Sequence, residues 1–300
     1  MASSSDGRPI HDVFEAFRNE LDEHNDRRER LIKASRDVTI ASKRVIFLLH
    51  RIMNETNGDY GALSARAARE GYKKLRDIQA LFKAMRPELE GDRFWRYQSN
   101  VSPGLQEYIE ALSFTHYLEQ GTLISYAGVQ VSLSDATTGP VSFRNVHPSV
   151  CGFILSVNSS PVLAAWQYFT LPVSDYLLGV SDLTGELMRF AISAIAKRGG
   201  RTKASEVCAF VRSCKADFEA FTPHVRDLGK KQRVTSQSLQ KIEDAAYAVA
   251  VRSSEYDLPP ELLDDIVSRQ VAGYGIGAGH DHHGSSRKRA RPDDEGAYSD

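Results

Sequence analysis

The sequence predicts an all-α protein, an antiparallel bundle of about seven helices. Apolar residues recur at spacings of three and four in successive segments, which is the period of an amphipathic helix. Strand-like and helix-like patterns do not alternate along the chain, which argues against an α/β fold. Two of the predicted helices also carry acidic pairs beside their apolar stripe, and a long stretch that is poor in charge separates these two helices.

The helical pattern is divided by turn-forming residues into a defined series of segments. Asn57-Gly58, Pro87 with Gly91, and Gly199-Gly200 are expected to end helices, and Pro103-Gly104 should kink or restart one. On this basis we predict helices over residues 10–31, 35–54, 60–85, 94–119, a short one to 133, 173–196, 202–221 and 223–252.

We expect one helical domain over residues 10–271, flanked by a disordered N-terminus at 1–9 and a disordered basic, His-containing tail at 272–300. Residues 134–171 form a predicted connecting loop between the two acidic helices. From 121 to 171 the chain has no Lys or Glu and is rich in Gly, Ser, Thr and Pro, with short β-like runs at 141–146 and 153–157. Such long loops tend to be functional or mobile.

Composition sets limits on the class of protein. The net charge of −1 and the pI near 6.8 do not predict a nucleic-acid binder from global charge, so any such surface must be local. Three cysteines in no metal-binding pattern favour a reduced, intracellular protein. We expect no signal peptide, because the N-terminus lacks a basic flank and an apolar core. No apolar run approaches the ~20 residues of a membrane span, so we expect no membrane partner.

The sharper acidic stretch runs from residue 175 to 189. Its apolar stripe is formed by Tyr176, Val180, Leu183, Leu187 and Phe190. Beside this stripe Asp175, Asp182 and Glu186 stand at i, i+7 and i+11, so their carboxylates share one helix face.

In the second stretch, residues 104–112, Glu107 and Glu110 stand one turn apart beside an apolar face. Carboxylates gathered between two helices repel one another and raise one another's pKa unless a cation intervenes. Oxygen-only ligands suit Mg²⁺ or Mn²⁺, which activate water for phosphodiester hydrolysis.

Less specific interpretations stay open for these acids. Each pair is also compatible with solvated charges on a helix rim, and Arg189 is placed for an ordinary salt bridge with Glu186. A di-iron bundle requires Glu-x-x-His on paired helices. Neither stretch supplies this motif, since His116 lies six residues beyond Glu110.

Other features carry weaker signals. The aromatic residues of 94–97 suit core or interface packing better than base stacking. The tract His280–His283 resembles a metal-binding tract in composition only, and Arg287–Arg291 is a candidate nuclear localisation signal. Basic residues gather in the first half, either as solvated helix faces or as a surface that follows phosphates: Arg27, Arg28, Arg30, Lys33, Arg36, Lys43, Arg44, Arg51, Arg66, Arg69, Lys73, Lys74 and Arg76.

Three segments, residues 35–52, 104–114 and 175–189, resemble the translin superfamily, and residues 251–255 add a weaker match. The resemblance extends from about residue 14 to 271 in the family's order. It implies a translin-like all-α fold and assembly with translin into a hetero-octameric shell. It further implies Mg²⁺-dependent cleavage of single-stranded RNA, including passenger-strand fragments of small interfering RNA and tRNA processing by-products, in the cytoplasm and nucleus, with single-stranded DNA as a further ligand.

Carried over residue by residue, the resemblance places the catalytic acids at Glu107, Glu110, Asp182 and Glu186. Glu110 and Glu186 are then the expected direct metal ligands, and Glu107 and Asp182 complete the site or orient water. The family's basic signal usually lies near the N-terminus rather than near the C-terminus, and residues 121–171 match no family motif. A non-enzymatic partner that stabilises translin and binds nucleic acid or other proteins is the alternative function.

Overall fold

The computed structural model describes residues 10–55, 59–134, 167–195 and 200–255. Over these residues it consists of seven helices without a strand, which confirms the predicted all-α class. The elements are α1 (Ile10–Met53), α2 (Tyr60–Leu89), α3 (Arg93–Gln120), α4 (Tyr126–Ser132), α7 (Val173–Ile195), α8 (Gly200–Phe221) and α9 (Leu228–Glu255).

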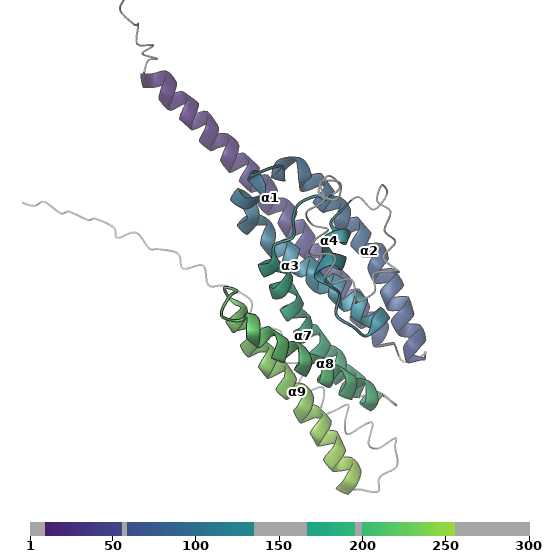
Figure 1. The fold of residues 1–300 in the computed structure, drawn as a ribbon. Coiled ribbons are helices and arrows are strands. Elements are labelled where there is room, and N and C mark those ends of the chain that lie inside the picture. The colour runs from purple at the N-terminus through teal and green to yellow at the C-terminus, as the bar shows by residue number, and fades with distance from the viewer. Residues whose placement is uncertain (1–9, 56–58, 135–166, 196–199, 256–300) are drawn as a thin grey trace, which may run out of the picture.

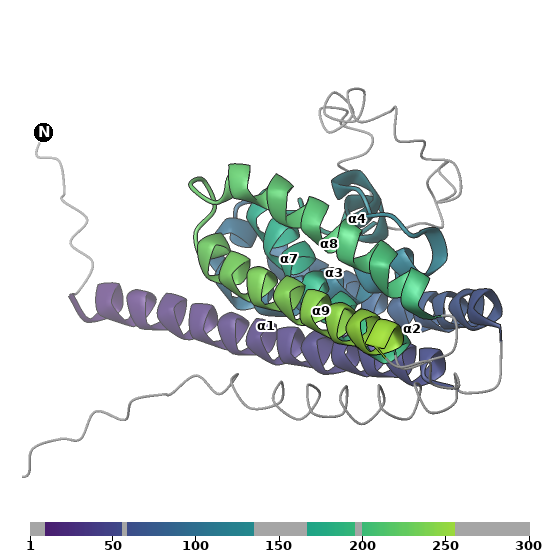
Figure 2. The ribbon, with the colours of Figure 1, turned by 90° about the horizontal axis from the view of Figure 1, so that it is seen from below.

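Two groups of three long helices are joined through one helix pair. In the first group α3 packs against α1 and α2, and in the second α7 packs against α8 and α9. Helices α3 and α7 then pack against each other and connect the groups (Figures 1 and 2). The centre of the molecule is aromatic, with Tyr108, Phe82 and Phe114 fully buried. The two helices with acidic pairs are therefore the ones that hold the two halves together.

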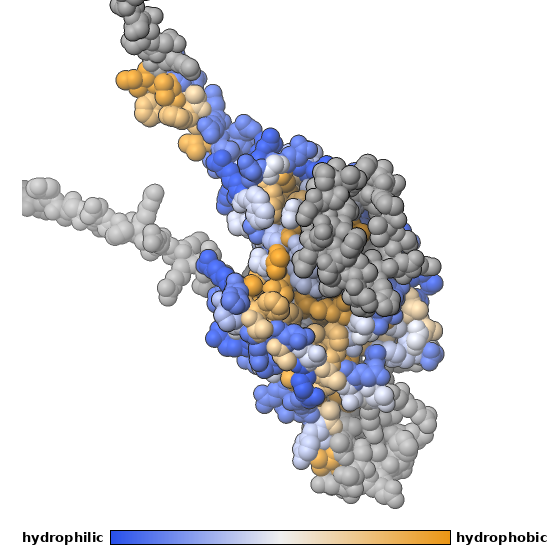
Figure 3. All heavy atoms as spheres, in the orientation of Figure 1, coloured by the Kyte–Doolittle hydropathy of each residue, from blue (hydrophilic) through white to orange (hydrophobic). Residues whose placement is uncertain are grey.

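Helix α1 is one uninterrupted helix, so the predicted break between residues 31 and 35 is wrong. No Gly or Pro occurs between residues 10 and 53, and Lys33-Ala34 favour the helix, so nothing stops it. Its N-terminal part extends beyond the other helices and exposes an apolar cluster at its tip (Figures 1 and 3). The cluster comprises Ile10, Val13, Phe14, Phe17 and Leu21.

Helix α3 runs through Pro103, so the predicted restart does not occur. A serine of α1 supports the backbone at this point. The Oγ of Ser35 donates to the carbonyl of Val101 (3.3 Å) and accepts from the N–H of Gly104 (3.1 Å). A Cβ at position 104 would lie 2.6 Å from the Ser35 carbonyl oxygen. The close approach of α1 and α3 therefore requires a glycine there.

Helix α2 continues past its predicted end at residue 85 and includes Pro87. The last turn is held against α1, because Leu89 is buried and Glu88 forms ion pairs with Arg27 and Arg30 (both 2.8 Å). Packing and charge thus outweigh the cost of proline near a helix end.

The second half follows the predicted order with shifted boundaries. Helix α7 matches its expectation within one residue, and α8 begins two residues before its predicted start. The predicted helix from residue 223 begins only at Leu228, because residues 222–227 form a turn in which Asp227 has a φ of 68°.

The structure describes both ends of the long predicted loop, and these two ends contact each other. Ser134 and Gln167 form an isolated antiparallel bridge, and the N–H of Tyr168 donates to the carbonyl of Leu133 (2.9 Å). The two ends of residues 134–171 therefore lie together beside α4. The β-like runs at 141–146 and 153–157, the termini at 1–9 and 272–300, and the predicted domain's end at 256–271 lie outside the described residues. No helix of the described residues is both long and apolar enough to span a membrane.

Candidate functional site

Helices α3 and α7 approach each other closely beside the acidic residues. A Cβ at Gly179 would be 2.8 Å from the Cβ of Ile109 and 2.9 Å from the carbonyl oxygen of Gln106. Only a glycine permits the two backbones to come this close. Ile109 precedes Glu110, and Gly179 stands one turn before Asp182, so this contact brings the acidic stretches of both helices to one place.

Asp175, which shares a face with Asp182 and Glu186, has a structural role. Its side chain is buried and accepts hydrogen bonds from three residues of α3: Ser102 Oγ (2.9 Å), Gln106 Nε2 (2.8 Å) and Gln98 Nε2 (3.4 Å). A buried carboxylate needs this number of donors to offset its loss of water. Asp175 therefore joins the start of α7 to α3.

The predicted acids influence one another electrostatically. Burial raises the pKa of Glu110 well above its ordinary value, and the charges of Asp182, Glu186 and Glu107 raise it further. Lys231 lowers that pKa and opposes the acids only in part. The four residues, two from α3 and two from α7, thus form one electrostatic group, which we call the acidic centre.

Three members of the acidic centre bind cationic side chains. Glu186, which is 7% exposed, lies 2.7 Å from His50 Nε2 through Oε2 and accepts from Arg189 through Oε1 (2.9 Å). The predicted i,i+3 salt bridge with Arg189 therefore exists. Around the rim, Lys43 Nζ lies 3.0 Å from Glu107 Oε1, and Lys231 of α9 is paired with Asp182.

Within the described residues, the carboxylates of the acidic centre are less tightly gathered than another group of possible ligands. Among the described residues, the group of three acids or histidines whose ligand atoms lie within 4.8 Å of one another is His11, Asp12 and Glu15, on the exposed first turns of α1. Within the same part of the chain, no three members of the acidic centre meet this distance. A carboxylate without a cation partner turns to the nearest lysine, arginine or histidine. We expect a bound cation to compete with these side chains.

The donor set of the acidic centre fits a hard divalent cation. It offers carboxylate oxygens from two helices, and Lys43, Arg189 and Lys231 already balance part of their negative charge. Lys43 and Arg189 are more than half exposed, so these two side chains are free to swing away when a cation binds.

Two residues that contact the acidic centre were not predicted from the sequence. His50 lies on α1, 136 residues from Glu186, and its ring also packs on Phe114 with centroids 4.8 Å apart. Lys231 arrives from α9. No local pattern marks either residue, since each becomes relevant only through tertiary packing. The resemblance offered one signal for His50, because residue 50 falls within the segment 35–52.

Two of the aromatic residues of 94–97 pack in the core as predicted, and part of the basic set is paired with acids. Phe94 is buried and stacks on Phe169 at a centroid distance of 5.0 Å, and Tyr97 is buried and lies 2.7 Å from His24, whereas Trp95 is exposed. Several of the predicted basic residues pair with acids on neighbouring helices, as do Arg27 and Arg30. The tracts at 280–283 and 287–291 lie outside the described residues.

Comparison with known proteins places these features in a family. The model of the Translin family matches residues 26–253. The chain is 35% identical over 266 residues to the Translin-associated protein X of Rattus norvegicus, covering 88% of this chain and 86% of that protein. It is 36% identical over 261 residues to that of Pongo abelii, covering 87% and 84%, and 20% identical over 240 residues to the Translin of Gallus gallus, covering 80% and 92%.

Solved structures share the fold. A chain of the AfC3PO–duplex RNA complex superposes with a TM-score of 0.51 at 19% identity, covering 81% of this chain and all of that one. This likeness concerns the helical architecture alone. The match over residues 26–253 and the identity to the mammalian proteins show that the chain belongs to the translin family.

Proposed function

We propose that this chain is the catalytic subunit of a complex with translin and that the complex is a Mg²⁺-dependent endoribonuclease. Its substrates are single-stranded RNAs such as passenger-strand fragments and tRNA processing fragments. The similarity supports the choice of subunit, since identity is 35–36% to proteins named Translin-associated protein X and 20% to a Translin. One observation carries the catalytic part: α3 and α7 pack closely beside their acidic stretches, and the charges of Glu107, Asp182 and Glu186 raise the pKa of Glu110.

Each acid has a proposed role. Glu110 and Glu186 hold the cation directly, while Glu107 and Asp182 complete its surroundings or orient the attacking water. A Mg²⁺ or Mn²⁺ ion there supplies the positive charge that stabilises the developing phosphate charge and lowers the pKa of water. His50 fixes the orientation of the Glu186 carboxylate through its 2.7 Å contact. Because the pKa of Glu110 is raised, this carboxyl gives up a proton when a cation binds, which makes binding tighter as pH rises.

The test is cleavage of a 5′-labelled single-stranded RNA by the reconstituted pair of this chain and translin. We expect cleavage with Mg²⁺ or Mn²⁺ and none with EDTA. Glu110→Gln and Glu186→Gln should each reduce the rate by more than about 100-fold, because outer-shell partners of metals already account for 10–100-fold. Size-exclusion chromatography should show intact assembly for both variants.

The matched control is Glu15→Gln, which removes the same charge from the exposed group of α1. This variant should cleave at the wild-type rate. Full activity of both Glu110→Gln and Glu186→Gln in an intact complex would rule out the catalytic proposal.

A specific observation favours a second candidate, a non-enzymatic partner of translin that binds nucleic acid. Three acids of the centre already hold protein cations, and no three of its ligand atoms lie within 4.8 Å among the described residues. The two functions differ in their response to metal. A purely structural partner would bind RNA equally well with Mg²⁺ and with EDTA and would leave the strand intact in both.

A further inference from the structure

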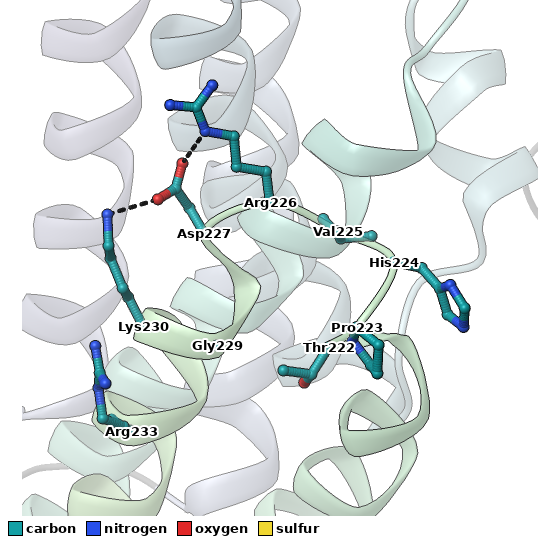
Figure 4. Close-up of a pocket in the computed structure, with 9 residues that line it drawn as sticks. All are labelled: Thr222, Pro223, His224, Val225, Arg226, Asp227, Gly229, Lys230 and Arg233. Carbon is teal, nitrogen blue, oxygen red and sulfur yellow. Dashed lines mark hydrogen bonds and ion pairs between the residues drawn. The ribbon is translucent and has the colours of Figure 1, made fainter.

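The turn between α8 and α9 lines an open cationic cavity, and Lys231, beside one of its lining residues, pairs with Asp182 of the acidic centre. The cavity has a volume of about 520 Å³ and is shallow, and its walls come from the turn and the first two turns of α9. Figure 4 shows its lining. The lining residues are Thr222, Pro223, His224, Val225, Arg226, Asp227, Gly229, Lys230 and Arg233.

Three cations share this surface with one carboxylate. Asp227 forms ion pairs with Lys230 (2.7 Å) and with Arg226 (3.8 Å), and Arg233 stands nearby on the same side of the turn, whereas His224 points away (Figure 4). The Arg226 side chain is 96% exposed and that of Lys230 is 73% exposed. The hydrogen bond from Lys230 lowers the pKa of Asp227, so Asp227 is a carboxylate at neutral pH and the local surplus of positive charge is about two.

The same helical turn is anchored on α7 beside the catalytic acids. Lys231, which follows Lys230, pairs with Asp182, and Gln232 Nε2 donates to Ser181 Oγ (3.3 Å). Leu228 is fully buried at the start of α9. Successive side chains on a helix diverge, so Lys231 faces the acidic centre while Lys230 faces the cavity. The backbone that carries these cations is therefore held close to Asp182.

We propose that the α8–α9 turn binds backbone phosphates of single-stranded RNA next to the bond that is cut at the acidic centre. This inference rests on the proposed function and adds a site for the flanking nucleotides. Arginine and lysine bind phosphate oxygens without reading the base, and the lining contains no Phe, Tyr or Trp on which a base would stack. The site is thus sequence-tolerant. The incoming phosphate replaces Asp227 as the partner of Arg226 and Lys230.

The experiment measures binding rather than cleavage. The complex of the full chain with translin is titrated in EDTA against a fluorescein-labelled single-stranded RNA, and anisotropy is recorded at several salt concentrations. The slope of log K against log salt falls in magnitude by about 0.7 for each phosphate of a single strand that the protein no longer neutralises. Arg226→Ser and Arg233→Ser should each show this fall and a weaker affinity. Arg18→Ser, which removes the same charge from the exposed start of α1, should show neither.

A second kind of variant should change the RNA affinity in the opposite direction. Asp227→Asn removes the competing carboxylate, and asparagine tolerates the left-handed backbone at this position. It should bind the RNA more tightly than wild type, with its melting temperature confirming an intact fold. A site that contacts phosphate therefore predicts weaker binding for the two arginine variants and tighter binding for Asp227→Asn.

The outcomes separate this inference from the proposed function. Unchanged salt slopes for both arginine variants would overturn the phosphate site even if Glu110→Gln abolished cleavage. Loss of assembly with translin in both arginine variants would also overturn it, since the turn would then be a protein interface. Altered slopes in a complex that never cleaves RNA would keep the phosphate site and refute the nuclease.

Discussion

Two groups of possible metal ligands in this molecule differ in burial. Neither the distances between their ligand atoms nor their spacing in sequence reveals this difference. His11, Asp12 and Glu15 bring their ligand atoms within 4.8 Å, yet all three are exposed at the tip of α1. The acidic centre is more spread, but its members are partly or fully buried where α3 meets α7, and burial and neighbouring charges raise the pKa of Glu110. Water screens the repulsion between exposed carboxylates, whereas buried carboxylates repel one another more strongly. We therefore expect a cation at the acidic centre rather than at the tip of α1.

The largest expected effect that distinguishes the two groups is stabilisation by metal. A ligand that binds only the folded state stabilises it by about 2.7 kcal/mol at 100 times its dissociation constant. We expect Mg²⁺ to raise the melting temperature of the complex with translin, and Glu110→Gln to abolish the rise. The measurement is differential scanning fluorimetry with and without Mg²⁺. Replacing His11, Asp12 and Glu15 together should leave the rise intact, and loss of the rise in that variant would move the cation site to α1.

The sequence alone predicted the helix α7 and the acidic pairs of this comparison. Helical periodicity placed α7 within one residue, and the two acidic pairs followed from spacing and from the family resemblance. What spacing cannot supply is the partner across a tertiary contact. His50 and Lys231 reach the acidic centre from α1 and α9, and Asp175 joins α7 to α3 instead of joining the acids.

Helix boundaries were predicted less well for the same reason. Local rules placed breaks at Pro87 and Pro103, but ion pairs to Glu88 and the hydrogen bonds of Ser35 support the helix at these points. Both supports come from α1, and both depend on residues distant in sequence. Proline therefore marks a cost to the helix, and tertiary packing decides whether the helix ends.

A smaller effect concerns pH in the absence of metal. Glu110 has a raised pKa in the folded state and about 4.3 in the unfolded chain. The folded state therefore binds its proton more tightly, and the free energy of unfolding falls as pH rises from about 4.3 to the raised pKa. Glu110→Gln should remove this loss, so in EDTA the variant gains stability relative to wild type as pH approaches neutrality. Melting curves across this range measure the difference.

Glu15→Gln should follow wild type throughout, and a Glu110→Gln curve parallel to wild type would show that Glu110 is not held among charges.

The smallest effects test the packing that brings the acids together, through two glycines of one helix. At Gly179 a methyl group would meet Ile109 at 2.8 Å, whereas at Gly185 nothing lies within 4 Å. Overpacking costs about 1–3 kcal/mol, and alanine in a helix interior is favoured over glycine by about 0.5–1 kcal/mol. Gly179→Ala should therefore lower the melting temperature and weaken the Mg²⁺ effect, because α7 must move away from α3. Gly185→Ala should raise the melting temperature and keep the Mg²⁺ effect. If Gly179→Ala lost stability but kept full Mg²⁺ stabilisation, the close helix approach would serve folding alone, and the acidic centre would not depend on it.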